Sequence, residues 1–422
     1  MAYDFVTRLN RRDSGSTKWN LMLEKNPAAA SGIVPLSVAD MEFKNPPEIL
    51  AALRRYLDDA ILGYTDPTDE FLEACAQWQR RRHGWQAEKR FIVVTPGVVP
   101  ALYGAVRSLT KPGEGVIVQT PVYTPFRTAV EDAGRVLVSN PLKVVEETTE
   151  AMPAEAPGAT GTVVRHRYEM DFDDLAKKAA DPNNTLLLLC NPHNPVGRAW
   201  SAADLRRLLD ICVQNGVVVV SDEIHGDLVL PGFTHTSIMQ VADVGEYSSV
   251  MVCTAPSKTF NLAGCQSSVA FVPHESMRDA LREELGRSAI WQLNALAYPA
   301  TIAAYTECDA WLEELLEVIS GNYAFLRGFM ERYLPEIEVY QLEATYLAWL
   351  DFRAWGLTPQ ELEDFMTKDA LLFFDEGYVF GEEGNGFERI NLACPRSVIE
   401  ESLERLVAAA RERKLGTFGG VA

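Results

Sequence analysis

A lysine and an acidic residue each follow an apolar run of this sequence, where burial would change their chemistry. Lys258 stands shortly after the run 249–253, among small and apolar residues. Desolvation lowers the pKa of a lysine, and a neutral amine is what Schiff-base formation with an aldehyde requires. Asp222 comes almost directly after the valines 217–220, where burying a carboxylate costs several kcal/mol unless a cation is nearby. Taken singly, such a lysine is more often an exposed loop lysine, and such an aspartate is more often part of a structural ion pair or a cap.

Three further positions offer polar or aromatic groups beyond other apolar runs. Asn194 lies in Asn-Pro-His-Asn-Pro-Val-Gly-Arg, residues 191–198, where two prolines hold the turn and leave its amide as a donor. Gly97 precedes a predicted helix over 101–109, and free N–H groups at a helix N-terminus attract anions. Tyr123 supplies an aromatic face. Each signal is weak when it stands alone. The 191–198 motif, for example, also suits a simple exit turn.

Together these five residues match the parts of one cofactor, pyridoxal 5′-phosphate (PLP). Its phosphate is an anion, which suits the residues around Gly97. Its ring can stack on Tyr123 and accept from Asn194, and its pyridinium nitrogen stays protonated beside a carboxylate such as Asp222. Its aldehyde needs an amine, which Lys258 provides. No metal ligand set is expected.

These residues require elements that bring them to one place. Residues 90–275 alternate between apolar runs and amphipathic segments, which predicts a mainly parallel, doubly wound sheet buried on both faces. In such a sheet, ligands collect at the carboxyl ends of the strands. The predicted strands are 115–119, 135–139, 185–190, 217–220, 249–253 and 268–272. A helix capped by Ser201 and ended by Gly216 is predicted between two of them.

The rest of the chain suggests further units around this sheet. With 422 residues, the chain exceeds a single core of ~100–200 residues. After about residue 290 we expect a long helical stretch over 291–331, strands at 345–352 and 388–392, and helices at 359–369 and 397–413. We therefore predict a large domain over 46–290, a small α+β domain over 291–422, and a loop-like arm over 1–45 that packs on the small domain or on a partner. Residues 145–165 are expected to form a solvated loop or insertion.

Composition limits the partners and the compartment. The net charge is −20, which argues against nucleic acids and anionic membranes as partners. No apolar run approaches the ~20 residues of a membrane span, and no secretory signal is visible. The seven cysteines lack C-x-x-C spacing, so reduced thiols and a cytoplasmic location are expected.

The motifs resemble those of a known family. The run Ser-Lys-Thr-Phe-Asn-Leu-Ala-Gly at 257–264, with Asn-Pro-His-Asn-Pro-Val-Gly upstream and Ser-Asp-Glu-Ile-His at 221–225 between them, is similar to the signature of fold-type-I PLP enzymes of aminotransferase class I/II. The likeness spans roughly residues 30–410. It implies the aspartate-aminotransferase fold, with a three-layer large domain built on a mainly parallel seven-stranded sheet and a smaller α+β domain.

This resemblance also implies roles for individual residues. Lys258 would carry the cofactor, Asp222 would pair with the ring nitrogen, and Asn194 would bind the ring hydroxyl beside the stacked Tyr123. The implied phosphate-binding residues are Gly97, Val98, Val99, Ser257 and, from the neighbouring subunit of a homodimer, Tyr64.

The substrate would be a small amino acid. Its α-carboxylate would be gripped by Arg389 as a bidentate fork and by the backbone N–H of Ala39. Asn194 would also contact it, and Lys258, Asp222 and Tyr64 are the implied catalytic residues.

Two positions depart from the family pattern. His225 stands where many aminotransferases have a tyrosine that donates to the ring oxygen, so it is either a cofactor contact or a packed structural histidine. Gln266 stands where many relatives have an arginine for the phosphate, which would leave Ser257, Tyr64 and backbone groups to bind the anion.

Subfamily motifs indicate the reaction. Residues 38–43, 222–227, 259–264 and 380–384 look most like the cystathionine β-lyase and cystalysin branch. This resemblance implies α,β-elimination of L-cystathionine or cysteine S-conjugates to a thiol, pyruvate and ammonia. An aminotransferase is the runner-up, because both reactions share every step up to the carbanion. A PLP-binding regulator without turnover is the third hypothesis.

Overall fold

The strands form three sheets within residues 2–150 and 162–416, which this computed structural model describes. The largest has the order β1-β9-β8-β7-β6-β2-β3, and β9 alone runs antiparallel to its neighbours. Its strands are β1 (Ile92–Thr95), β2 (Gly115–Val118), β3 (Val136–Ser139), β6 (Asn184–Cys190), β7 (Val218–Asp222), β8 (Val250–Thr254) and β9 (Ser268–Phe271). The predicted mainly parallel, seven-stranded sheet is confirmed.

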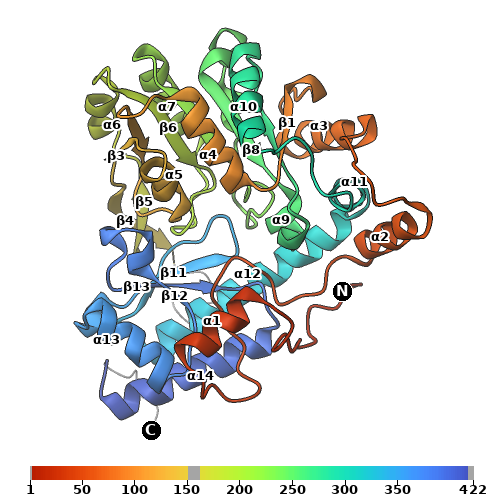
Figure 1. Cartoon of the computed structure of the whole chain (residues 1–422). Coiled ribbons are helices and arrows are strands. Elements are labelled where there is room, and N and C mark those ends of the chain that lie inside the picture. The colour runs from red at the N-terminus through yellow and green to blue at the C-terminus, as the bar shows by residue number, and fades with distance from the viewer. Residues whose placement is uncertain (1, 151–161, 417–422) are drawn as a thin grey trace.

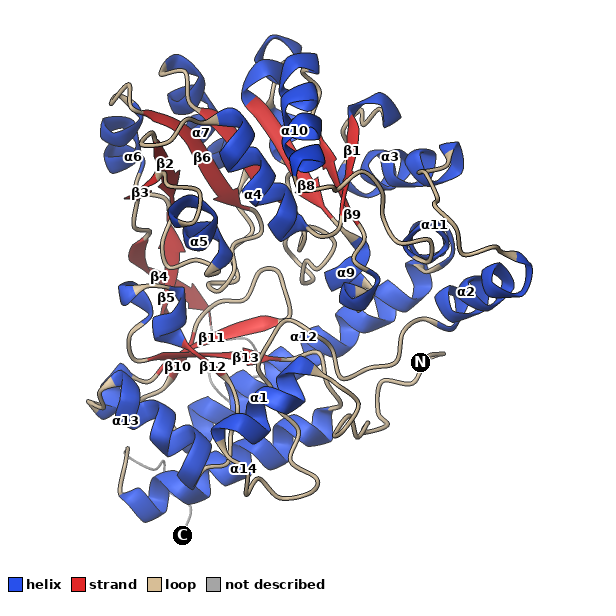
Figure 2. Ribbon diagram, viewed as in Figure 1, coloured by secondary structure: helices blue, strands red, loops and turns tan. Residues whose placement is uncertain are grey.

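Helices cover both faces of this sheet (Figures 1 and 2). Alternate side chains of a strand point to opposite faces, so Val116 and Val118 of β2 join one core and Ile117 joins the other. The first face carries α4 (Val98–Leu109), α5 (Pro125–Glu131) and α10 (Glu275–Arg287), and the second carries α6 (Phe172–Ala179), α7 (Ala202–Gln214) and α8 (Ile238–Val241). Burial on both faces explains why the strands are continuously apolar.

Helix α7 forms as the sequence predicts. The Ser201 side chain accepts from the Asp204 backbone N–H, and the Asp204 side chain accepts from the Ser201 backbone N–H, which makes a reciprocal capping box. Leu205, Leu208 and Leu209 are fully buried against the sheet.

A second, four-stranded antiparallel sheet lies below the first in Figure 1. Its order is β10-β11-β13-β12, from β10 (Glu338–Val339), β11 (Leu347–Asp351), β12 (Asp375–Glu376) and β13 (Phe387–Asn391). The helices α12 (Asp309–Tyr333), α13 (Pro359–Asp364) and α14 (Arg396–Arg413) surround it. The expected mixed α/β character of this region is present, while the domain boundaries near 45 and 290 stay predictions.

Five α-helices remain among the described residues. They are α1 (Thr17–Lys25), α2 (Pro47–Asp59), α3 (Asp69–His83), α9 (Pro256–Thr259) and α11 (Ala297–Glu307). Short 3₁₀ turns are η1 (Lys89–Phe91), η2 (Val244–Ser249), η3 (Ala263–Cys265), η4 (Arg353–Trp355), η6 (Gly377–Phe380) and η7 (Glu382–Gly384), and η5 (Phe365–Asp369) is a π turn. Among the described residues, no helix combines the length and apolar character needed to cross a membrane.

For the chain's irregular segments, one expectation is wrong, and of the loop and insertion expected at 145–165 the plain loop is excluded. Residues 1–45 are not loop-like throughout, because α1 forms there and buries Trp19 and Met22. Packing stabilises so short a helix, and packing is not visible in the local sequence. The excursion at 145–165 is also not simply a loop, since β4 (Lys143–Glu150) and β5 (Thr162–Glu169) pair along their full lengths. Residues 151–161 lie outside the described part.

Two helix boundaries also differ from expectation. Helix α4 begins at Val98 rather than at residue 101, because Pro100 is tolerated in a first turn, where its missing N–H has no helical partner. The stretch 291–331 is two helices, α11 and α12. They separate at Cys308, where φ −111° and ψ 17° leave the helical region.

Candidate active site

A cavity of about 430 Å³ lies at the carboxyl ends of β6, β7 and β8. Its lining brings together all the predicted site residues except Tyr64: Ala39, Gly97, Val98, Val99, Tyr123, Asn194, Asp222, His225, Ser257, Lys258 and Arg389. They come from segments far apart in the chain, as expected for the carboxyl edge of a parallel sheet.

Lys258 enters this cavity from α9, just beyond β8. Its Nζ donates a hydrogen bond of 2.9 Å to the carbonyl oxygen of Ala39. Burial, assisted by the positive charge of Arg389, lowers the pKa of Lys258 to about 8. The lysine therefore loses its proton far more easily than an exposed one.

Asp222 is the last residue of β7, and its carboxylate is buried at the floor of the cavity. Oδ1 accepts a hydrogen bond of 3.0 Å from the backbone N–H of Ile224. Burial raises the pKa of Asp222 to about 7. A cation placed in the cavity beside this carboxylate would favour its ionised form.

His225 is buried on the cavity wall, with its ring edge-on to Tyr346 at 6.1 Å. Burial lowers the pKa of His225 well below its usual value, so the imidazole is neutral. Within the described residues its Nδ1 has no hydrogen-bond partner. His225 thus lines the cavity, as the family pattern suggests, and its Nδ1 is left without a hydrogen bond to the described part of the protein.

Arg389 of β13 lies against Asn194 and a residue that the sequence reasoning missed, Asp375 of β12. Arg389 Nη1 donates to Asn194 Oδ1 at 2.7 Å, and Nη2 forms an ion pair with Asp375 Oδ2 at 2.6 Å. The Arg389 side chain is only 4% exposed. Asp375 had a signal of the kind that pointed to Asp222, because it follows the apolar run 371–374 directly.

The amino end of α4 forms one wall of the cavity. Gly97 has φ 138°, a conformation that favours glycine, and it lets Val98 begin the helix at once. The first N–H groups of α4 therefore have no helical acceptor and are available to an anion. Ser257 and Gln266 line the same cavity.

Tyr64 is not part of this cavity within a single chain. Its side chain is fully exposed, in the connection between α2 and α3. The neighbouring Ile61 and Leu62 are also exposed, and Trp291 is 70% exposed. Hydrogen bonds from Tyr298 to Thr65 and from Gln292 to Asp66 join the two segments that carry these side chains.

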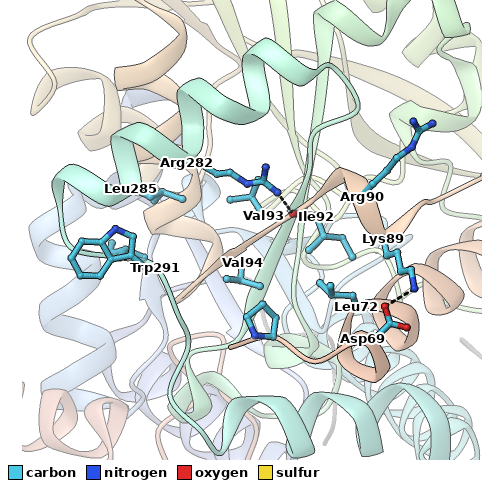
Figure 3. Close-up of a pocket in the computed structure, with 12 residues that line it drawn as sticks. Asp69, Leu72, Lys89, Arg90, Ile92, Val93, Val94, Arg282, Leu285 and Trp291 are labelled. Atoms are coloured by element: carbon cyan, nitrogen blue, oxygen red, sulfur yellow. Dashed lines mark hydrogen bonds and ion pairs between the residues drawn. The ribbon is translucent and has the colours of Figure 1, made fainter. Parts of the chain in front are cut away.

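A second cavity, of about 520 Å³, lies beside β1 and α10 (Figure 3). Figure 3 shows Lys89 paired with Asp69, and Arg282 bonded to the carbonyl oxygen of Ile92. As far as the structure describes the chain, its lining includes none of the predicted site residues. Its charged groups face local partners, so it offers no comparable chemistry.

Comparison with known proteins identifies the family. The family model "Aminotransferase class I and II" matches residues 31–406. The chain belongs to the aminotransferase class I and II family. Among curated members, cystathionine beta-lyase PatB of Bacillus subtilis is 40% identical over 407 residues, which cover 96% of this chain and 99% of PatB.

Solved structures of PLP-containing proteins are also similar to this chain over nearly its whole length. Cystalysin of Treponema denticola, which contains a pyridoxal 5′-phosphate cofactor, has a TM-score of 0.90 and 43% identity, covering 98% of this chain and all of that one. The PLP-bound C-S lyase of Staphylococcus hominis has a TM-score of 0.84 and 29% identity, covering 97% and 98% of the two chains. The fold of this family explains why the cavity forms at the carboxyl edge of the large sheet.

Proposed function

We propose that this protein is a PLP-dependent carbon–sulfur β-lyase. It eliminates the thiol from L-cystathionine or related cysteine S-conjugates, with pyruvate and ammonia as the other products. The observation that carries this proposal is the convergence of Lys258, Asp222 and Arg389 in one cavity of a chain so similar to carbon–sulfur lyases over its full length.

The cavity fits PLP in its chemistry. Asp222 is a buried carboxylate whose ionisation needs a cation, which a protonated ring nitrogen supplies. Asn194 accepts from Arg389 through Oδ1, so its amide NH₂ is left to donate to a ring oxygen. The unpartnered imidazole nitrogen of His225 offers a further polar contact.

The remaining cofactor contacts follow from the cavity walls. Tyr123, 37% exposed and lining the cavity, offers an aromatic face to the ring. The amino end of α4, at Gly97, Val98 and Val99, receives the phosphate together with the Ser257 hydroxyl. With Gln266 in place of an arginine, the phosphate relies on hydrogen bonds more than on a local positive charge.

When bound, PLP would supply an aldehyde carbon for amines and a cationic ring that withdraws electrons from Cα. Lys258 holds the cofactor and then takes the Cα proton on Nζ, for which its lowered pKa prepares it. Asp222 keeps the ring nitrogen protonated. The sulfur leaves Cβ with the electron pair of the broken C–S bond, and one water is consumed as pyruvate and ammonia form.

The substrate is oriented by its α-carboxylate. Arg389 offers N–H donors at the cavity wall, and Ala39, whose backbone N–H is the second proposed donor, lines the same cavity. Two fixed donors on one carboxylate set the direction of the Cα–H bond relative to Lys258.

The active protein is a homodimer in this proposal, and its second copy supplies Tyr64 to the phosphate. Exposed Ile61, Leu62 and Trp291 beside Tyr64 support an interface there, because adjacent exposed apolar side chains mark contact surfaces. We also place the protein in the cytoplasm, a reducing compartment that suits its seven free cysteines.

One assay tests the activity. The purified protein is incubated with L-cystathionine and no keto acid, and pyruvate and thiol are measured. Equal amounts of both are expected. A parallel incubation with L-alanine and 2-oxoglutarate measures glutamate, and strict dependence on this acceptor would make the protein an aminotransferase instead.

The lysine assignment has its own control. Lys258→Ala protein should lose both elimination and the visible absorbance of the lysine-bound cofactor. Persistence of that absorbance in the variant would refute Lys258 as the attachment point.

A further inference from the structure

Asp375 places a second carboxylate in the cavity, and the sheet register fixes its position. Asp375 of β12 lies directly opposite Arg389 of β13 in the antiparallel pairing. Side chains directly opposite each other lie on the same face of a sheet and in contact range. Both line the cavity that holds Lys258, and the Asp375 side chain is 18% exposed there.

Hydrogen bonds on several sides hold the Asp375 carboxylate. Oδ2 accepts from Arg389 Nη2 at 2.6 Å and from Arg389 Nε at 3.2 Å. It also accepts from the backbone N–H of Val38 at 2.9 Å. The carboxylate is thus fixed between β13 and the segment that carries Ala39, and it cannot turn away without losing these bonds.

Arg389 remains competent to bind a substrate in this arrangement. A guanidinium carries five N–H donors. Asp375 takes one from Nε and one from Nη2, and Asn194 takes one from Nη1. One N–H remains on each terminal nitrogen, and such a pair matches the two oxygens of a carboxylate.

The residues described as lining the cavity provide no free cation for an anionic group on the substrate sulfur. Of the residues described as lining it, those that can carry positive charge are Arg389, Lys258 and His225. Arg389 serves the α-carboxylate, Lys258 serves the cofactor, and burial keeps His225 neutral. With an anionic group on the substrate sulfur, the single positive charge of Arg389 would therefore face three negative groups: Asp375, the α-carboxylate and that anion.

We propose that Asp375 is a specificity-determining residue that orients Arg389 and rejects cysteine conjugates with a net negative charge on the sulfur substituent. This inference rests on the proposed lyase function. The favoured substrates carry neutral, cationic or zwitterionic substituents, and the far end of cystathionine, with one ammonium and one carboxylate, belongs to the last class. Like charges separated by several ångströms in a partly buried site repel strongly enough to decide between such substrates.

Two nearly isosteric substrates test this proposal. S-carbamoylmethyl-L-cysteine and S-carboxymethyl-L-cysteine differ mainly in the charge of the group on sulfur. The kcat/KM ratio of amide to acid is measured for the wild type and for Asp375→Asn, because intrinsic leaving-group reactivity cancels between the two proteins. We expect the ratio to fall by about tenfold in the variant, chiefly through a lower KM for the acid.

Glu376→Gln is the matched control. Glu376 follows Asp375 in β12, and its replacement by glutamine removes a carboxylate in the same way. Its side chain points to the opposite face of the sheet, because successive strand residues alternate, and its carboxylate pairs with Lys25. The amide-to-acid ratio should not change in this variant. A change of equal size in both variants would mean that overall charge, not Asp375, sets the preference.

The inference and the proposed function fail in different ways. If the wild type releases no pyruvate from cystathionine or from either conjugate, the lyase function fails, and calorimetric dissociation constants for the same two conjugates then test Asp375. If turnover is normal but the ratio is unchanged in Asp375→Asn, the inference is overturned. Asp375→Ser provides a second variant if the asparagine protein does not fold.

Discussion

At the scale of single residues, burial moves the pKa values of Lys258 and Asp222 toward neutrality. The lysine pKa falls to about 8 and the aspartate pKa rises to about 7, in both cases chiefly through desolvation of the charged form. A buried amine that is easily deprotonated and a carboxylate that needs a cation both favour a ligand that supplies an aldehyde and a pyridinium. The apoprotein therefore bears a desolvation cost at both residues, which a bound cofactor would relieve.

The first prediction concerns cofactor capture by the apoprotein. Only neutral Lys258 attacks an aldehyde, so the rate of PLP incorporation should rise about tenfold per pH unit below the lysine pKa and level off above about pH 8. Stopped-flow absorbance after mixing apoprotein with PLP measures this rate. A rate that continues to rise about tenfold per pH unit through about pH 10 would contradict the lowered pKa.

The second prediction concerns the stability cost of Asp222. An acid whose pKa is raised by folding destabilises the folded state as pH rises; the cost is absent below 3.8 and complete above about 7. The rise corresponds to about 4 kcal/mol at pH values above that range. Apoprotein with Asp222→Asn should resist urea better than wild-type apoprotein at about pH 8 and equally at about pH 4. Lower resistance of the variant at about pH 8 would show that Asp222 stabilises the fold.

At the scale of elements, the site depends on where strands end and on how two short strands pair. Asp222 is the last residue of β7, and Asn194 and Lys258 follow the ends of β6 and β8, the two neighbours of β7 in the large sheet. Arg389 and Asp375 meet because β12 and β13 pair in one register. A slip of one residue would turn Asp375 to the opposite face and remove it from the cavity.

The third prediction tests that register through Gly377, which directly follows β12. An added Cβ there would overlap the carbonyl oxygen of Gly384 and lie 2.6 Å from that of Phe387. Backbone atoms cannot rotate away, so Gly377→Ala should cost about 3 kcal/mol of stability and raise the KM for cystathionine by displacing Asp375. Urea unfolding and steady-state kinetics measure the two effects. Gly245→Ala is the control, since nothing lies within 4 Å of its added Cβ, and equal stability of both variants would refute the prediction.

At the scale of the whole molecule, the proposed phosphate ligand Tyr64 does not reach the cavity of its own chain. Tyr64 is fully exposed and lies outside the cavity that its predicted partners line. Exposed apolar side chains beside it are what a second copy would cover. A phosphate ligand supplied in this way would couple dimer formation to cofactor affinity.

The fourth prediction follows from that sharing. Tyr64→Ala and Lys258→Ala homodimers should each have little activity, for want of a phosphate contact and of the lysine respectively. A mixed dimer contains one site with wild-type Lys258 from one chain and wild-type Tyr64 from the other. Co-refolding the two variants should therefore recover a substantial part of the activity of one intact site. No gain on mixing, with exchange verified by tagged chains, would exclude the shared site.

The sequence by itself determined six of the seven strands of the large sheet, all but β1, and much of the cavity lining. Continuous apolar runs required burial on both faces, and the polar residues after them had to gather at one edge because parallel strands end together. These are local patterns, so Lys258, Asp222 and Asn194 could be found without coordinates. Helix α7 was equally visible, because Ser201 and Asp204 make a capping box within a single turn.

Only the tertiary structure decided the contacts that depend on packing and register. Helix α1 forms through burial of Trp19 against distant residues, and the pairing of β4 with β5 could not be read from a polar stretch. The pairing of Asp375 with Arg389 depends on strand register, which no local pattern specifies. Long-range pairing is a property of the folded chain, and for that reason the charge selection proposed for this site became visible only in three dimensions.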